Sequence, residues 1–176
     1  MPNELKTTGL TSRMMKLALI DNLKTLFEGK KYHGQQSMKP LKFFDQNLPI
    51  DNRDDESSET DDSDSPYIVV LTSEGKIPDK NSPQIVSVML TICCYDESVE
   101  RYGYADVENI KEDIIQHFRE YPYFGGAFTV MCEPDHPIQW AHQMDDTTPY
   151  YFGAVLFDVT VPAKTGDQNK DWSDMI

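Results

Sequence analysis

Residues 149–161 constrain the fold more than any other stretch of the sequence. Apolar and aromatic side chains recur at every second position of this run, and Asp158 is its single charged residue. A period of two is typical of a β-strand with a buried face. A strand of this length needs neighbouring strands, so the sequence predicts a sheet.

A second long strand is predicted over residues 84–95, and both of its faces are apolar. One face holds Val86, Val88, Leu90, Ile92 and Cys94, and the other holds Ile85, Met89, Cys93 and Tyr95. Such a strand is covered either twice by its own chain, or once by its own chain and once by a neighbouring subunit. The sequence leaves these two arrangements open.

Two amphipathic helices are predicted. The first spans about 11–28, where apolar residues keep a spacing of three and four before Gly29, which can adopt the positive φ of a helix end. The second spans about 105–121, with carboxylates in its first half and Pro122 at its end. Shorter strands are predicted at 41–44, 67–72 and 127–133, with a further candidate at 138–142.

These elements predict an α+β fold, with a mostly antiparallel sheet of about four to five strands and two main helices packed on it. Residues 1–161 form a single domain in this interpretation. We expect a flexible N-terminal arm at 1–10, a mobile acidic insertion at 51–65 and a polar C-terminal tail at 162–176. The insertion contains no apolar residue, so burial cannot offset the entropy of ordering it.

The net charge of −14, from 30 acidic and 16 basic residues, excludes several kinds of partner. Proteins that grip nucleic acids or anionic membranes present Lys and Arg to phosphates, so we expect no membrane partner and no direct DNA binding. An acidic wall is compatible with DNA that slides past it, because like charges repel. The insertion 51–65 carries half of the excess charge but lacks the Gly and Glu positions of a calcium-binding loop.

The three cysteines, Cys93, Cys94 and Cys132, lie in apolar runs and are predicted to be buried free thiols in a reducing compartment. No run approaches the ~20 apolar residues of a membrane-spanning helix, and the first thirty residues do not resemble a signal peptide. We therefore expect the protein to be made and assembled in the cytoplasm.

Residues that could carry catalysis or bind a metal are sparse. Glu133, Asp135, His136 and His142 crowd one short span, but their spacing matches no metal-binding motif. Cys132 and His136 lack a third catalytic partner and an oxyanion loop. We therefore predict no enzyme activity, no catalytic residues, no cofactor and no metal, and keep a metal-dependent or thiol enzyme as the minor alternative.

Aromatic residues give the stronger signal, because they gather at predicted strand ends and loops. Tyr and Trp are enriched at the centres of protein interfaces, although aromatic residues at strand ends can equally cover a core. The candidates for a subunit or partner interface are Tyr121, Tyr123, Phe124, Trp140, Tyr150, Tyr151 and Phe152.

Several motifs, in order, resemble a known family. They are the runs beginning at Pro66 (Pro-Tyr-Ile-Val-Val), Gly103 (Gly-Tyr-Ala-Asp-Val-Glu-Asn-Ile), Pro122 (Pro-Tyr-Phe-Gly-Gly), Pro137 (Pro-Ile-Gln-Trp) and Pro149 (Pro-Tyr-Tyr-Phe-Gly). Over roughly residues 14–161 the chain is similar to tail terminators, the small tail-completion proteins of bacteriophages from Gram-positive hosts and of phage-like contractile particles.

The resemblance implies an α+β subunit of a homohexameric ring that caps the tail tube, stops its polymerisation and joins the tail to the head connector. The implied partners are other copies of the chain, the tail tube protein, the sheath in contractile tails, and the head connector or neck protein, with DNA passing through the lumen. The implied location is the virion, and the family contributes no catalytic residues. Two alternatives stay open: another head–tail joining protein, and an acidic protein-binding module that acts through 51–65.

Overall fold

The computed structural model describes residues 10–49 and 65–163. Nearly all of the predicted N-terminal arm, acidic insertion and C-terminal tail lies outside these residues. The described elements are α1 (Ser12–Leu26), β1 (Tyr32–His33), β2 (Met38–Lys39), β3 (Lys42–Asp45), β4 (Tyr67–Lys76), β5 (Gln84–Tyr95), α2 (Gly103–Glu120), β6 (Tyr123–Phe124), β7 (Phe128–Val130), β8 (Gln139–His142) and β9 (Tyr150–Val161).

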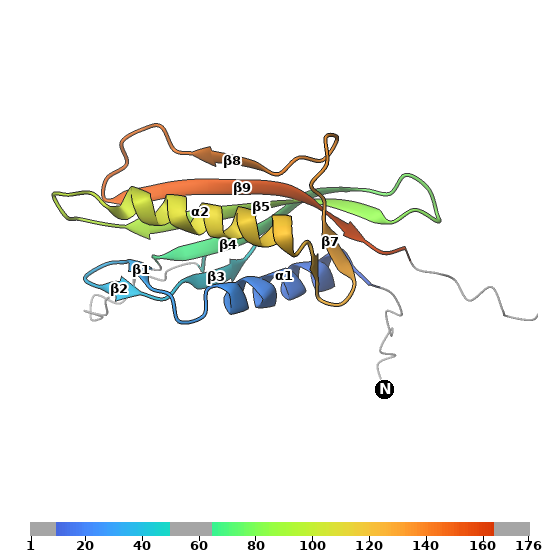
Figure 1. The fold of residues 1–176 in the computed structure, drawn as a ribbon, viewed down its shortest axis with the longest axis horizontal. Coiled ribbons are helices and arrows are strands. Elements are labelled where there is room, and N and C mark those ends of the chain that lie inside the picture. The colour runs from blue at the N-terminus through green and yellow to red at the C-terminus, as the bar shows by residue number, and fades with distance from the viewer. Residues whose placement is uncertain (1–9, 50–64, 164–176) are drawn as a thin grey trace, which may run out of the picture.

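The predicted sheet is wrong in size and in type. Within the described residues it has seven strands, in the order β3-β4-β5-β9-β7-β6 with β8 paired to β9, and a separate two-stranded sheet joins β1 to β2. The large sheet is mixed because β3 runs parallel to β4, whereas its other pairs are antiparallel. Two helices accompany it, so the fold is α+β with a larger, curled and mixed sheet (Figure 1).

The two long predicted strands form the centre of the sheet. β5 and β9 pair antiparallel along their whole length, from Gln84 opposite Val161 to Tyr95 opposite Tyr150. β4 covers the other edge of β5 and is longer than predicted, because the chain passes through a bulge between Thr72 and Glu74 instead of turning. Strand alternation then resumes, with Lys76 opposite Ile85.

The first helix begins and ends where the sequence predicts. The side chain of Thr11 accepts a hydrogen bond from the backbone N–H of Met14 at 3.1 Å, which satisfies one of the free donors of the first turn. Gly29 follows the helix with φ of 76°, a conformation in which a side chain would be strained. Lys16, although largely buried, ties the helix to the sheet by an ion pair with Asp45 at 2.7 Å.

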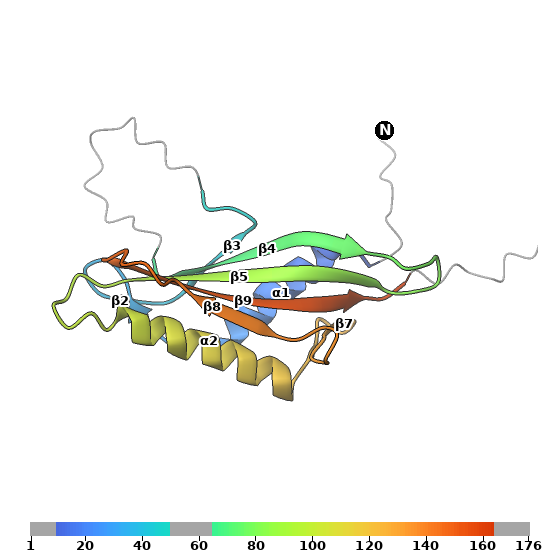
Figure 2. The ribbon, with the colours of Figure 1, turned by 90° about the horizontal axis from the view of Figure 1, so that it is seen from above.

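Both helices pack on the same face of the sheet (Figure 2). The core lies between them and that face. Its strand members occupy alternate positions, and its helix members form the apolar stripes of α1 and α2. The fully buried large side chains of this core are Met15, Leu19, Leu23, Ile68, Val70, Leu90, Ile92, Val107, Ile110, Ile114, Phe118 and Val155.

The three cysteines differ in their exposure, and this predicts a simple chemical difference. Cys93 and Cys94 are fully buried, whereas Cys132 is exposed, so its predicted burial is wrong. Burial raises the pKa of the Cys93 thiol to about 11 and also raises that of Cys94, which keeps both thiols protonated at pH 8.

We expect a disulfide reagent such as DTNB to titrate one thiol per native chain and three after unfolding in denaturant. The native reaction should vanish in Cys132→Ser. Rapid reaction of a second thiol in the native Cys132→Ser protein would contradict the burial of the vicinal pair.

Candidate interaction surfaces

The face of the sheet that points away from both helices, here called the open face, is apolar over most of its length. Its apolar and aromatic members on β3, β4, β5, β8 and β9 are Phe44, Tyr67, Val69, Leu71, Ile85, Met89, Cys93, Tyr95, Ala141, Tyr150, Phe152, Ala154 and Leu156, and its polar members include Lys42, Glu74, Lys76, Ser87, Thr91, Gln139 and Asp158. No helix of the described residues covers these side chains (Figure 2). Leu71, Met89 and Leu156 lie side by side across three strands and remain half-buried instead of fully buried.

Aromatic rings close one end of the open face. Phe44 meets Tyr67 edge-on at 5.9 Å between ring centroids, and these two residues, with Phe152, surround the buried Cys93. Beyond Phe152, Tyr150 stacks on it at 6.3 Å and meets Tyr95 edge-on at 4.9 Å. Edge-to-face and offset ring pairs of this kind are more favourable than their buried area alone. This end of the face is therefore rigid and aromatic.

The opposite end of the open face carries its charge. Asp158 accepts hydrogen bonds from the Ser87 hydroxyl at 2.7 Å and pairs with Nδ1 of His136 at 2.6 Å. Partial burial opposes ionisation of Asp158, but these bonds and the nearby Lys76 ammonium outweigh it, so the pKa of the carboxyl lies below its usual value. This end of the open face thus carries the carboxylates of Asp158 and Glu74 and the ammonium of Lys76.

No pattern in the sequence predicts this network. The available signal was Asp158 itself, a single carboxylate in the outward phase of an otherwise uncharged strand. Its partners come from β5 and from the loop before β8, and no local pattern in the sequence connects them to it.

The seven predicted interface aromatics do not form one cluster. Tyr150 and Phe152, two of the predicted interface residues, lie on the open face, which no helix of the described residues covers. Phe124 is 3 % exposed and packs between Phe118 and Phe128 in the core. The remaining four lie elsewhere. Tyr121 and Tyr123 are exposed around the end of α2, Trp140 is exposed on β8, and Tyr151 is partly buried on the helix side of β9.

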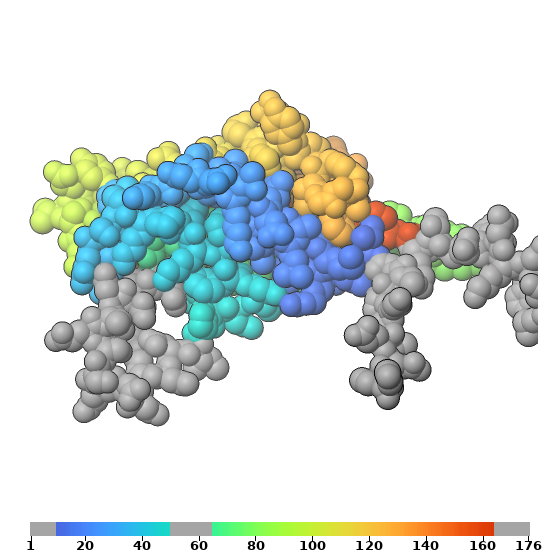
Figure 3. Space-filling model, turned by 90° about the horizontal axis from the view of Figure 1, so that it is seen from below, coloured from blue at the N-terminus to red at the C-terminus, as the bar shows by residue number. Residues whose placement is uncertain are grey.

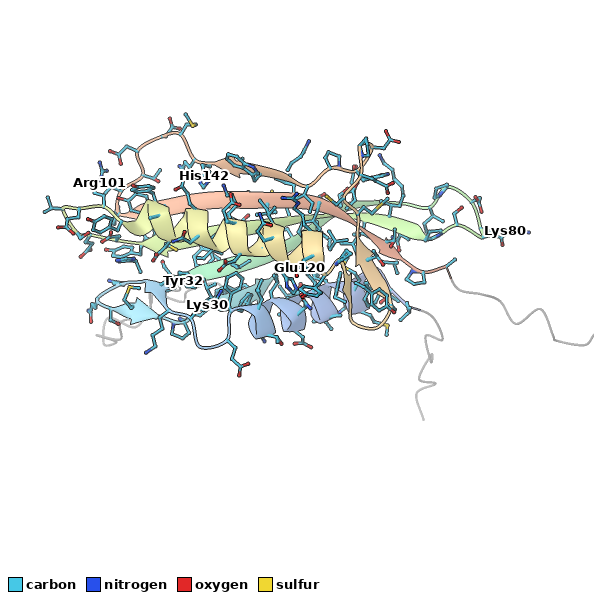
Figure 4. All side chains as sticks on the ribbon, in the orientation of Figure 1. Lys30, Tyr32, Lys80, Arg101, Glu120 and His142 are labelled. Atoms are coloured by element: carbon cyan, nitrogen blue, oxygen red, sulfur yellow. The ribbon has the colours of Figure 1, made fainter. Side chains whose placement is uncertain are left out.

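A recess of about 550 Å³ lies between the start of α2 and the loop that follows β8. Arg101, paired with Asp146 at 2.7 Å, stands at its outer side and His142 further in along the strand (Figure 4). Nε2 of His142 and the hydroxyl of Tyr151 are buried and have no hydrogen-bond partner among the described residues. Burial lowers the pKa of His142, aided by the Lys111 ammonium, so the ring is neutral at pH 7.

A second recess, of about 560 Å³, lies between the later part of α2 and β8. Trp140, which lines the second recess, has its ring centroid 3.8 Å from the Lys111 ammonium. The same ammonium pairs with Glu112 at 2.9 Å, so this largely buried lysine is compensated twice. The exposed Trp140 is thus held against α2, a contact that its position in the sequence did not indicate.

The residues considered for metal binding or thiol catalysis are not brought together. His136 is engaged with Asp158, and its backbone forms a bridge with Glu133. His142 lies on β8 with its ring 5.3 Å from that of Trp140. Among the described residues, no group of three or more His, Cys, Asp and Glu side chains is arranged to hold a metal ion. The described helices also include none that is long and apolar enough to cross a membrane.

Comparison with known proteins adds no assignment. No protein-family model matches the chain, and no curated protein is similar to it in sequence. The resemblance to tail terminators therefore rests on the motifs quoted above, and the surfaces of the fold carry the functional argument.

Proposed function

We propose that this protein is a structural subunit that assembles with copies of itself through the open face, and that the assembly is the ring of a tail terminator. In this role it caps a tail tube, ends its polymerisation and joins the tail to the head connector of a phage or a phage-like particle. The observation that carries the proposal is the apolar face that neither helix covers.

The size of the open face is appropriate for a subunit interface. β5 has 12 residues, and a strand of that length spans about 40 Å, while three strands at a spacing of about 4.8 Å are about 14 Å wide. The resulting area of roughly 600 Å² approaches the ~800 Å² that each partner buries in a standard interface. Part of this area is polar, and Val69 and Cys93 are already buried, so the half-buried Leu71, Met89 and Leu156 form the apolar centre that a partner would cover.

The charge of the chain is consistent with the remainder of the proposal. A net charge of −14 suits a ring that lets DNA pass without holding it, since phosphates are repelled from an acidic wall. The motif resemblance then favours the tail terminator among proteins that form rings. A structural role also accounts for the apolar side chains of the open face. It requires no catalytic motif, and the sequence shows none that we recognise.

Met89→Glu tests the self-assembly part of the proposal. The side chain lies in the middle of the open face, opposite Leu71 and Leu156, so a buried carboxylate there would lose its hydration without gaining a partner. In light scattering after size-exclusion chromatography, we expect the wild type to form an oligomer. The variant should need a protein concentration at least tenfold higher than the wild type for half of it to assemble. Its circular dichroism spectrum should be unchanged.

Gln116→Glu is the matched control, because it adds the same charge at an exposed position of α2 on the helix side. It should assemble as the wild type does. A wild type that stays monomeric at all accessible concentrations would refute self-assembly through this face. The tail role is tested separately: immunogold labelling of particles should mark the head-proximal end of the tail, and labelling along the tube or at its tip would exclude a terminator.

A further inference from the structure

The molecule has a second apolar surface, on the outer side of α1. Leu10, Met14 and Leu17, here called the α1 stripe, are 40 %, 46 % and 44 % exposed. At about 100° per residue Met14 and Leu17 lie opposite the buried side of the helix, which faces the sheet, and Leu10 directly precedes the N-cap Thr11. Figure 3 shows that α1 runs along the surface of the molecule, so this stripe is accessible to another protein.

The α1 stripe and the open face lie on opposite layers of the molecule. α1 belongs to the helix layer, whereas the open face is the far side of the sheet (Figure 2). A single copy therefore cannot use one to cover the other. Two different exposed apolar surfaces on opposite sides of one subunit favour head-to-tail association, in which the same contact repeats from copy to copy.

On each of the two surfaces, charged residues follow the apolar residues in the same direction. Along α1 the stripe is followed by Asp21 and Lys24, which are exposed on the same side of the helix. Lys24 lies about 10 Å beyond Leu17, at 1.5 Å per helical residue. On the open face the apolar centre is followed by Lys76 and Asp158. An α1 stripe laid along the face thus brings opposite charges within reach of one another.

A symmetric pairing of two open faces is the alternative arrangement. A two-fold axis parallel to the strands would place the Asp158 and Glu74 carboxylates of both copies at the same end, as like charges, which is unfavourable. An axis across the strands would place each Asp158 against the aromatic end of the other copy, where Lys42 lies beside Tyr67 in the strand register. The trapping experiment below distinguishes this second arrangement from a head-to-tail contact.

We propose that the α1 stripe of one copy docks on the open face of the next copy, with Leu17 over Met89 and Leu156 and with Lys24 toward Asp158. This inference rests on the proposed function, because it assumes that the chain self-assembles. It goes further by naming the two surfaces that meet and by making the contact heterologous, a type of contact that forms a ring when the rotation between successive copies closes.

Disulfide trapping between two differently labelled copies tests the contact. In a Cys132→Ser background, the remaining native thiols are buried. Leu17→Cys and Met89→Cys are prepared as separate full-length proteins, mixed in equal amounts and oxidised with copper phenanthroline. We expect a covalent dimer in the mixture and none from either protein alone. A chain that carries both cysteines should give a ladder of covalent oligomers.

The outcomes separate this inference from the proposed function. Dimers from Met89→Cys alone would show face-to-face pairing and overturn the head-to-tail contact while self-assembly stands. An oligomeric Cys132→Ser protein that gives no product in the mixture would likewise overturn the contact. A monomeric Cys132→Ser protein would overturn both proposals.

A charge placed in the α1 stripe gives an independent measurement. Leu17→Asp should raise the protein concentration needed for assembly at least tenfold, whereas Lys80→Asp, in the exposed turn between β4 and β5 (Figure 4), should leave it unchanged. Equal assembly by Leu17→Asp and the wild type would contradict the docking of α1.

Discussion

Replacing Gly153 by alanine is expected to lower the free energy of unfolding by about 1–3 kcal/mol, the usual cost of forcing an extra methyl group into a filled core. A Cβ at this position would lie 2.6 Å from Cγ1 of Val107, which is 1 % exposed and belongs to α2. The missing side chain therefore sets how closely α2 approaches β9. The gain from reducing chain entropy in the unfolded state, about 0.4–1 kcal/mol, is too small to compensate.

Chemical denaturation of two further variants controls this prediction. Gly153→Ala combined with Val107→Ala should lose less stability than the sum of the two single changes, because the second removes the atom that clashes. Gly75→Ala adds a methyl group to β4, where it meets the side chain of Gln84 near the exposed end of the strand, so it should change stability by less than about 0.5 kcal/mol. A Gly153→Ala protein as stable as the wild type would show that α2 is not held at this distance.

The second large effect is expected at Asp96, in the connection between β5 and α2. One of its carboxylate oxygens accepts from the backbone N–H of Ser98 at 2.8 Å, and the other accepts from that of Gly103 at 3.0 Å. The residue is 5 % exposed, so Asp96→Ala leaves the N–H of Gly103 without an acceptor at the start of α2. We expect a loss of about 1.5–3 kcal/mol from the buried bond to Gly103 alone, the usual contribution of one hydrogen bond to a charged group.

The pH dependence of stability separates charge from geometry at Asp96. Burial disfavours the charged carboxylate, but the hydrogen bonds from Ser98 and Gly103, together with the nearby His33, lower its pKa overall. Its contribution is therefore present above the unfolded pKa of about 3.9 and is lost as pH falls through the lower pKa of the folded state. The stability advantage of the wild type over Asp96→Asn, measured by denaturation, should shrink as pH falls below about 4. An advantage that is constant down to acid unfolding would contradict this role.

Long periodic segments were predictable because their patterns repeat. The alternation in β5 and β9 and the stripe of α1 appear in the sequence with nearly the bounds that the structure shows. Gly29 was also correctly placed just after α1, and the N-cap Thr11 lies at the predicted start of the helix. In each case, residues that are neighbours in the sequence show the property that the local structure requires, either a repeating apolar spacing or a residue type suited to a helix end.

The full sheet could not be predicted because part of it consists of very short strands. β6 has two residues, too few to show a period of two, and the strand predicted at 127–133 is β7, with only three residues. The parallel pairing of β3 with β4 depends on a connection of twenty or so residues that carries no helical or strand pattern. Turn-forming residues after Thr72 also indicated an end to β4, whereas pairing with β5 continues through the bulge to Lys76.

The position of the open face could be predicted only in part. The apolar character of both faces of β5 left open whether its own chain covers the second face, and no helix of the described residues lies over it. The choice of aromatic residues was less informative, since aromatic side chains serve cores and surfaces equally well. Phe124 lies in the core, whereas Met89 and Leu156, which the aromatic criterion ignores, lie at the centre of the open face.

The bulge in β4 has a consequence for evolutionary comparison. Because one residue is inserted after Thr72, Glu74 and Lys76 project to the side that odd-numbered residues occupy earlier in the strand. Distant relatives matched by hydrophobic alternation alone would be misaligned by one position beyond this point. In such an alignment the lysine that neighbours Asp158 would be counted as facing the helices, and a compensating change of charge between these two positions would go unnoticed.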